Sequence, residues 1–202
     1  MATLTLTFIA YLIGSLSSAV LVSRAFRLPD PRSYGSGNPG ATNVLRTGKK
    51  KAAVVTLVGD SVKGWLAVFI AGRFAETGQG ELAMACAGAA VIVGHMYPVF
   101  FRFQGGKGVA TALGVLFAFN IYLAAGTLAT WLIVFFFFRI SSLAALIAAL
   151  FAPFFTVLLY HPQHAFFAAV ALIAILLLWR HRTNIRNLLT GSETRIQNKK
   201  SV

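Results

Sequence analysis

The chain has 202 residues, of which 57% are hydrophobic and only 11% charged, and its mean hydropathy is +0.75. Soluble domains carry about 25% charged residues, so this composition excludes a soluble globular domain and predicts an all-α integral membrane protein in a single domain, 1–202. The net charge of +13 would indicate nucleic acid in a soluble protein; here the basic residues flank apolar runs, so we expect membrane-topology signals, an anionic substrate and no nucleic-acid partner.

Apolar runs of a length suited to a bilayer predict the membrane spans. The uncharged run 109–138 would measure about 45 Å as one helix against a hydrocarbon core of about 30 Å, so it is either one tilted span or two short spans that turn near Asn120. A turn there puts nearly all basic residues on one side, which the positive-inside rule favours. We therefore predict seven spans with the N-terminus outside, the first span retained and the C-terminus cytoplasmic: 4–23, 53–72, 82–101, 109–119, 121–138, 143–159 and 165–180.

A long polar segment, 24–51, separates the first two spans and contains the stretch from Ser36 to Val44. Its Ser, Gly and Pro residues oppose a regular helix and leave backbone N–H groups free for a ligand. Asn38, Thr42 and Asn43 add side-chain donors, and Arg46 follows within a turn. The segment thus predicts an anion-binding cradle at the membrane surface.

The second and third spans contain ionisable residues. Asp60 and Lys63 are spaced i, i+3 and can neutralise each other inside the membrane, either for architecture alone or as a substrate contact. His95 lies near the end of the third span, where we interpret it as a packed interfacial residue.

A glycine segment, Gly105-Gly106-Lys107-Gly108, leads directly into the fourth apolar run. Glycine lets backbone N–H groups approach a phosphate, the helix that follows directs its positive end toward the anion, and Lys107 adds a full charge. The spacing is not that of a Walker A loop. The alternative is a flexible inner turn with a topological lysine.

The tail begins at Arg180 and is expected to continue helically to a C-cap at Gly191. The neighbouring guanidiniums disfavour a charged imidazole at His181, so this side chain, with Asn184, is a candidate to accept or orient a proton. The arginines are alternatively membrane-surface anchors. The predicted topology brings 36–46, 104–111 and 181–193 to the cytoplasmic surface, where they form one site. Outside, an outer turn is expected at 161–164.

Several known site patterns are missing from the sequence. It contains no cluster with metal-ligand spacing, no G-x-S-x-G elbow, no dinucleotide fingerprint and no His-x₄-Asp acyltransferase motif. We therefore expect neither a metal nor a cofactor.

Three ordered motifs, SGNPGATNVLR (36–46), GHMYPVFFRFQGGKGVATALG (94–114) and RHRTNIRNLLTGSE (180–193), resemble those of the bacterial acyl-phosphate:glycerol-3-phosphate acyltransferases over essentially the whole chain. The resemblance implies acyl transfer from acyl-phosphate to the 1-hydroxyl of sn-glycerol 3-phosphate, which gives lysophosphatidic acid and phosphate in the first acylation of phospholipid synthesis. It also implies the bacterial inner membrane with a cytoplasmic active site, membrane lipid around the chain and a functional link to the soluble enzyme that forms acyl-phosphate. We expect a monomer.

The resemblance also assigns roles to residues. Ser36 and Arg46 match the functional pair of the first motif, and His181 and Asn184 match the active pair of the third. The expected substrate-binding residues are Asn38, Thr42, Gly105, Gly106, Lys107, Gly108 and, after Arg139, Ser142; Glu193 matches a residue with a structural role.

A transporter or channel for a phosphorylated metabolite is the alternative function. It predicts polar groups at mid-membrane and two related halves of the chain. The sequence shows no internal repeat and one buried charge pair.

Overall fold

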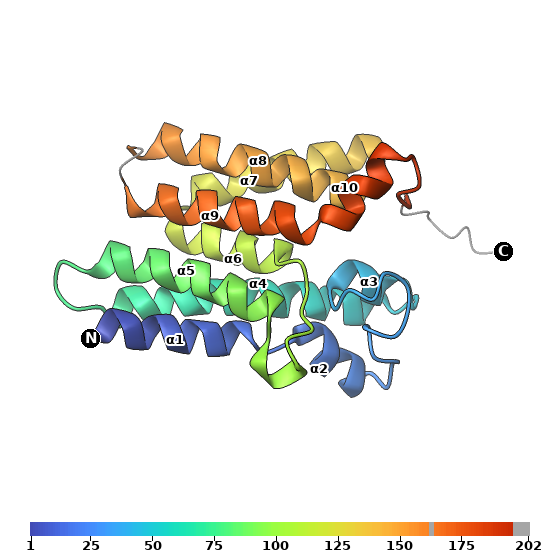
Figure 1. Ribbon diagram of the computed structural model, residues 1–202, viewed down its shortest axis with the longest axis horizontal. Coiled ribbons are helices and arrows are strands. Elements are labelled where there is room, and N and C mark those ends of the chain that lie inside the picture. The colour runs from blue at the N-terminus through green and yellow to red at the C-terminus, as the bar shows by residue number, and fades with distance from the viewer. Residues whose placement is uncertain (162–163, 196–202) are drawn as a thin grey trace.

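The structure is a computed structural model that describes residues 1–161 and 164–195, so Pro162 and Gln163 of the expected outer turn and the end of the tail lie outside the described residues. The described residues form helices joined by turns and loops, without strands (Figure 1). The helices are α1 (Ala2–Gly14), α2 (Ser18–Ala25), α3 (Ala41–Leu45), α4 (Lys50–Phe74), α5 (Gly80–Met96), the 3₁₀ turn η1 (Val99–Phe101), α6 (Val109–Phe119), α7 (Ile121–Phe138), α8 (Ser141–Leu159), α9 (Ala165–Arg180) and α10 (Arg182–Leu189).

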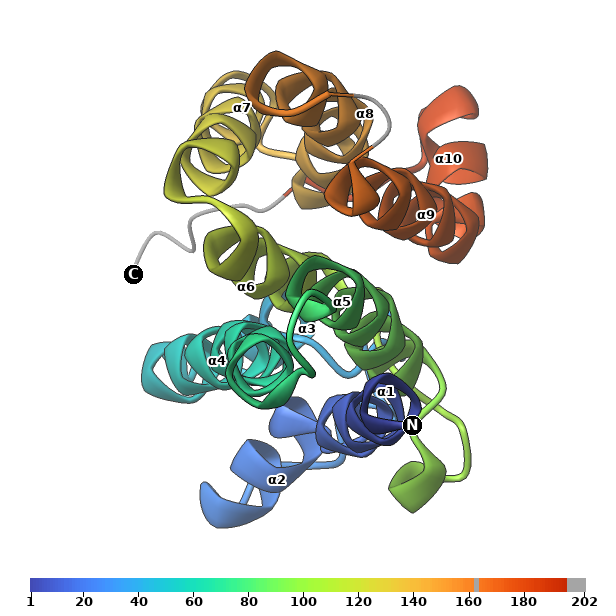
Figure 2. The same cartoon turned by 90° about the vertical axis from the view of Figure 1, so that its left-hand side faces the viewer.

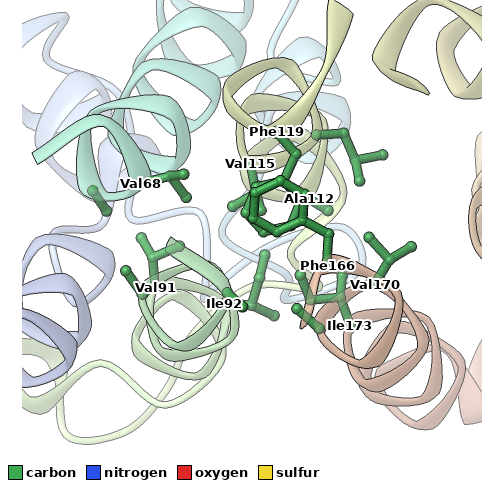
Figure 3. Packing of buried hydrophobic residues seen from close by; sticks show 14 of the residues in the cluster. Val68, Val91, Ile92, Ala112, Val115, Phe119, Phe166, Val170 and Ile173 are labelled. Atoms are coloured by element: carbon green, nitrogen blue, oxygen red, sulfur yellow. The ribbon is translucent and has the colours of Figure 1, made fainter. Parts of the chain in front are cut away.

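The long helices form two groups with α6 between them. Viewed along the bundle, α1, α4 and α5 make one group and α7, α8 and α9 the other (Figure 2). The core between α4, α5, α6 and α9 consists of small and branched side chains, with Phe119 stacked on Phe166 at a ring distance of 4.2 Å (Figure 3). Large apolar side chains such as Phe137 and Leu158 are instead 73% and 67% exposed, as expected of faces turned toward lipid.

Glycines let two helix pairs approach each other closely. A Cβ on Gly14 would run into the backbone of Val91, which ties α1 to α5, and a Cβ on Gly64 would run into the carbonyl of Thr111, which ties α4 to α6. Without a hydrophobic force between helices in lipid, such close backbone contact is a main source of association. These contacts fix α4, α5 and α6, which carry part of the site described below.

The first predicted span, 4–23, is not one regular helix. Helix α1 ends at Gly14 and α2 begins at Ser18, where Ser17 caps the new helix by accepting from the N–H of Val20. The carbonyl of Leu16 leaves the helical ladder and accepts a hydrogen bond of 2.7 Å from Lys63 Nζ. Hydropathy gave no indication of this break, because the tertiary contact that stabilises it has no signature in hydropathy.

The run 109–138 forms two helices that meet at Asn120. This residue is extended (φ −165°, ψ 131°), and its side-chain oxygen accepts hydrogen bonds from the N–H groups of Tyr122 and Leu123, which caps α7. Asn120 therefore ends one helix and starts the next, as the charge distribution predicted.

Within the described residues, five helical stretches are long and apolar enough to cross a membrane, and a sixth is added if the bent pair α9 and α10 is one span. These stretches include Ala2–Ala25 taken across its break, whereas α6, with 11 residues, is too short for the same test. The predicted count of seven includes α6 and stays a prediction, as does the orientation of the termini.

The three polar segments lie together at one end of the bundle. The 36–46 segment with α3, the loop from α5 to α6, the α7–α8 turn and α10 gather at the end opposite the N-terminus (Figure 1). Two helices separate each of these segments from the next, so the chain returns to the same end each time. The candidate site lies among them.

Candidate active site

A cavity of about 360 Å³ opens at this end of the bundle and has two chemically different halves. The polar half is lined by Ser36, Asn38, Thr42, Asn43, Arg46, Asp60, His95, Lys107, Ser141, Ser142, His181, Asn184, Glu193 and Thr194. The apolar half continues between α6, α7, α8 and α9 and is lined by residues such as Leu116, Trp131, Ala149, Ala152, Val170 and Ile173. One continuous space therefore offers charge at its mouth and hydrocarbon at its depth.

Asn43 shapes the first polar segment. Its side chain is 1% exposed; Oδ1 accepts from the N–H of Ser36 at 3.1 Å, and Nδ2 donates to the carbonyls of Pro31 and Tyr34 at 2.7 and 3.1 Å. These bonds fold the loop back on α3, so that Ser36 and Arg46 face the same cavity. The sequence suggested Asn43 only as a donor; in the structure it organises the loop.

The glycine segment delivers Lys107 to the cavity. Gly108 has φ +87°, a left-handed conformation that suits glycine, and starts α6 directly behind the lysine. Lys107 Nζ donates to Asn184 Oδ1 at 2.6 Å, which joins the second polar segment to the tail. Burial lowers the pKa of the Lys107 ammonium, and the Glu193 carboxylate opposes this effect.

The predicted residues Gly105 and Gly106 do not line this cavity. Their carbonyls accept hydrogen bonds from Arg180 at 2.8 and 3.1 Å, and Gly105 instead borders a second hollow that also includes Arg32. The arginine thus holds the back of the turn while Lys107 and Gly108 face the cavity.

The tail bends at His181. Helices α9 and α10 meet there at 59°, so the expected continuous helix to Gly191 is wrong, although Gly191 has φ +70° just beyond α10, as a helix-ending glycine should. The His181 side chain at this bend is 3% exposed, and its Nδ1 lies 2.8 Å from the carbonyl oxygen of Leu177.

The same contact defines the protonation of His181. Because a carbonyl only accepts, Nδ1 carries the proton and Nε2 keeps its lone pair. Burial lowers the pKa of His181 to about 4, with a smaller contribution from the charge of Lys107. The imidazole is neutral, as predicted, but burial rather than the neighbouring guanidiniums is the main cause.

Glu193 and Thr194 cross the mouth of the cavity. Glu193 Oε1 accepts from Ser142 Oγ at 2.6 Å and from Asn184 Nδ2 at 2.7 Å, and Arg46 Nη2 donates to Thr194 Oγ1 at 3.2 Å. Burial would raise the pKa of Glu193, but the hydrogen bonds outweigh it and hold the pKa below its ordinary value. We name residues 193–194 the strap; it contacts the first polar segment through Arg46, α8 through Ser142 and α10 through Asn184.

Asp60 and His95 also line the cavity, which the sequence did not lead us to expect for His95. Lys63 Nζ lies 2.9 Å from Asp60 Oδ1, so the predicted pair forms, and His95 Nδ1 lies 3.6 Å from the same oxygen. Among the described residues, no three His, Cys, Asp or Glu side chains gather as metal ligands.

Comparisons with known proteins point to one family. The family model for glycerol-3-phosphate acyltransferase matches residues 4–191. Glycerol-3-phosphate acyltransferases of Cupriavidus taiwanensis and Burkholderia ambifaria are 59% and 62% identical to this chain, over 100% and 95% of it and 100% and 90% of their own length.

Two solved structures share the whole fold. They are crystal structures of PlsY (YgiH), an integral membrane glycerol 3-phosphate acyltransferase, in a glycerol 3-phosphate form and a lysophosphatidic acid form. Their TM-scores are 0.90 and 0.89 at 39% and 38% identity, over 98% of this chain and 96% of theirs. The chain therefore belongs to the glycerol-3-phosphate acyltransferase family and is a multi-pass membrane enzyme of the PlsY type.

Proposed function

We propose that this acyltransferase uses acyl-phosphate as its donor and releases lysophosphatidic acid and inorganic phosphate. The observation that carries the proposal is the two-part cavity, whose cationic mouth suits phosphate groups and whose apolar depth suits a fatty chain. Ser142 and Ala152 are ten residues apart on α8, so the cavity follows that helix for about 15 Å. A product that joins a phosphate to a long acyl chain matches this division.

The mouth carries the groups that we assign to the two substrate phosphates. Lys107 and Arg46 supply positive charge, while Ser36, Asn38 and Thr42 supply neutral donors beside them. Charge-assisted hydrogen bonds to phosphate are shorter and about twice as strong as neutral ones, so the two cations contribute most of the binding. Gly108 and Ser142 border the same space.

The chemical step needs little more than positioning. The 1-hydroxyl oxygen attacks the acyl carbonyl carbon, the bond from that carbon to the phosphate oxygen breaks, and the phosphate leaves with both bonding electrons. A mixed anhydride is already activated, so a neutral His181 Nε2 with Asn184 can orient the hydroxyl. The released proton passes to His181 Nε2 or to an oxygen of the donor phosphate.

The cellular setting follows from the same chemistry. We propose that the charged mouth faces the cytoplasm from the bacterial inner membrane, where a soluble enzyme supplies acyl-phosphate, and that the chain acts as a monomer in lipid without a cofactor. The basic residues that cluster at the mouth end support this orientation. Membership of an acyltransferase family removes the support for the transporter alternative.

A donor competition tests the proposal. Purified protein in lipid receives glycerol 3-phosphate with palmitoyl-phosphate, palmitoyl-coenzyme A or palmitoyl-acyl carrier protein, and lysophosphatidic acid and phosphate are measured. We expect product from palmitoyl-phosphate alone, with one phosphate released per product. Equal turnover with palmitoyl-coenzyme A refutes the donor assignment.

A further inference from the structure

A line of buried polar groups runs from the α1–α2 break to the glycine segment. Lys63 Nζ donates to the carbonyl of Leu16 at 2.7 Å and contacts Asp60 Oδ1 at 2.9 Å. Asp60 Oδ1 lies 3.6 Å from His95 Nδ1, which is also 3.2 Å from Thr111 Oγ1 on α6. The chain of contacts thus joins four segments behind the cavity.

The position of this ion pair is not explained by helix packing alone. Ionisable groups in a membrane protein are costly to bury, and they usually face a cavity that uses them. Asp60 and His95 both line the cavity, and Asp60 Oδ1 makes no geometrically sound hydrogen bond among the described residues. The ion pair is therefore placed to orient the His95 ring.

His95 contacts the turn that precedes Lys107, through its backbone and through its ring. Its carbonyl accepts the N–H of Gly106 at 3.1 Å, and a Cβ on Gly106 would run into His95 Nε2. The imidazole edge and the backbone carbonyl therefore hold Gly106 from two directions. Asp60 and Thr111, on the Nδ1 side, fix the ring in the orientation that makes this contact.

We propose that His95, held by Asp60 and Thr111, is a positioning residue for the glycerol 3-phosphate site: it sets the Gly106 turn so that Lys107 reaches the cavity. Lys107 is the next residue, and its ammonium makes the 2.6 Å bond to Asn184. A ring that turns away releases Gly106 and moves the lysine from the acceptor phosphate. The inference rests on the proposed function, which places Lys107 among the groups that bind the substrate phosphates, and here we assign it to the phosphate of glycerol 3-phosphate.

Two variants with a matched control test the proposal. Asp60 is left intact because its removal strands Lys63 as a buried charge and threatens the fold. Thr111→Val and Thr156→Val make the same change at residues that are both 0% exposed, but Thr156 Oγ1 bonds only to Ala152 of its own helix. His95→Gln removes the ring itself.

The readouts are the KM for each substrate, kcat, and glycerol 3-phosphate binding by calorimetry without a donor. We expect the KM for glycerol 3-phosphate to rise about 5-fold in Thr111→Val and about 10-fold or more in His95→Gln, with the KM for the donor unchanged and binding weakened in parallel. Thr156→Val should stay within about 2-fold of wild type.

Several outcomes overturn the proposal. They are a KM for glycerol 3-phosphate in Thr111→Val equal to that of Thr156→Val, an equal rise in both substrate KM values, or a fall in kcat alone. If His95→Gln fails to fold, Thr111→Val decides. A wild-type protein that ignores palmitoyl-phosphate refutes the proposed donor, whereas the calorimetric comparison still tests the role of His95.

Discussion

Acidification tests the environment of the His181 imidazole. Burial sets its pKa at about 4, against an ordinary value of 6.5. Because the folded pKa lies below the unfolded one, the unfolded chain takes up the proton first, and the stability present above pH 6.5 is lost as the pH falls toward 4. At pH 5 these two values correspond to a loss of about 2 kcal/mol relative to pH 8.

The assay is chemical unfolding in detergent micelles at pH 8 and pH 5. We expect wild type to lose about 2 kcal/mol more than His181→Gln over this interval, because the variant lacks the titrating ring. Arg182→Gln is the control: its guanidinium stacks on Trp179 at 5.1 Å, and the variant keeps the ring, so it should retain the wild-type pH dependence. Equal losses in wild type and His181→Gln would refute a buried, neutral imidazole.

Three further changes address other parts of the molecule. Lys107→Met should raise the KM for glycerol 3-phosphate about 10- to 100-fold in the acyltransferase assay, because it removes a charge-assisted hydrogen bond to phosphate. Lys51→Met, on the exposed surface of α4, is the control and should leave this KM as in wild type. An unchanged KM in Lys107→Met contradicts the role of Lys107. Ala149→Phe should shift the donor preference toward shorter acyl chains, because the larger side chain fills the apolar half of the cavity. Leu150→Phe is the control: Leu150 is 59% exposed on the same helix, and its variant should keep the wild-type chain preference. A shift in Leu150→Phe without one in Ala149→Phe contradicts the cavity assignment. Asn120→Ala should lower the free energy of unfolding in micelles by about 1 kcal/mol through loss of the α7 cap, and an unchanged value means that packing alone ends α6.

Hydropathy and charge predicted much of the helix order because both act over whole segments. The division of 109–138 at Asn120 shows this best: length alone left two interpretations, and the distribution of basic residues favoured the one that the structure has. The gathering of the three polar segments at one end followed from the same topology. Their cytoplasmic orientation stays a prediction.

The local departures depend on partners far away in the chain. The break after Gly14 is stabilised by Lys63, and the bend at His181 by burial of an imidazole in the bundle. Neither interaction changes the spacing of apolar residues along the sequence, which is the pattern that predicts helices. His95 was interpreted as a packed interfacial residue for the same reason, since Asp60 is distant in the sequence.

The strap has a consequence for the measured affinity of the enzyme. If glycerol 3-phosphate binds Lys107 through its phosphate and Asn184 through its hydroxyl, it requires a hydrogen-bonding group, Asn184, that Glu193 already holds. Glu193 is then a tethered competitor, and the apparent affinity equals the intrinsic affinity multiplied by the fraction of molecules whose mouth is open. The carboxylate thus sets the concentration range of glycerol 3-phosphate over which the enzyme responds, without contact to the reacting atoms.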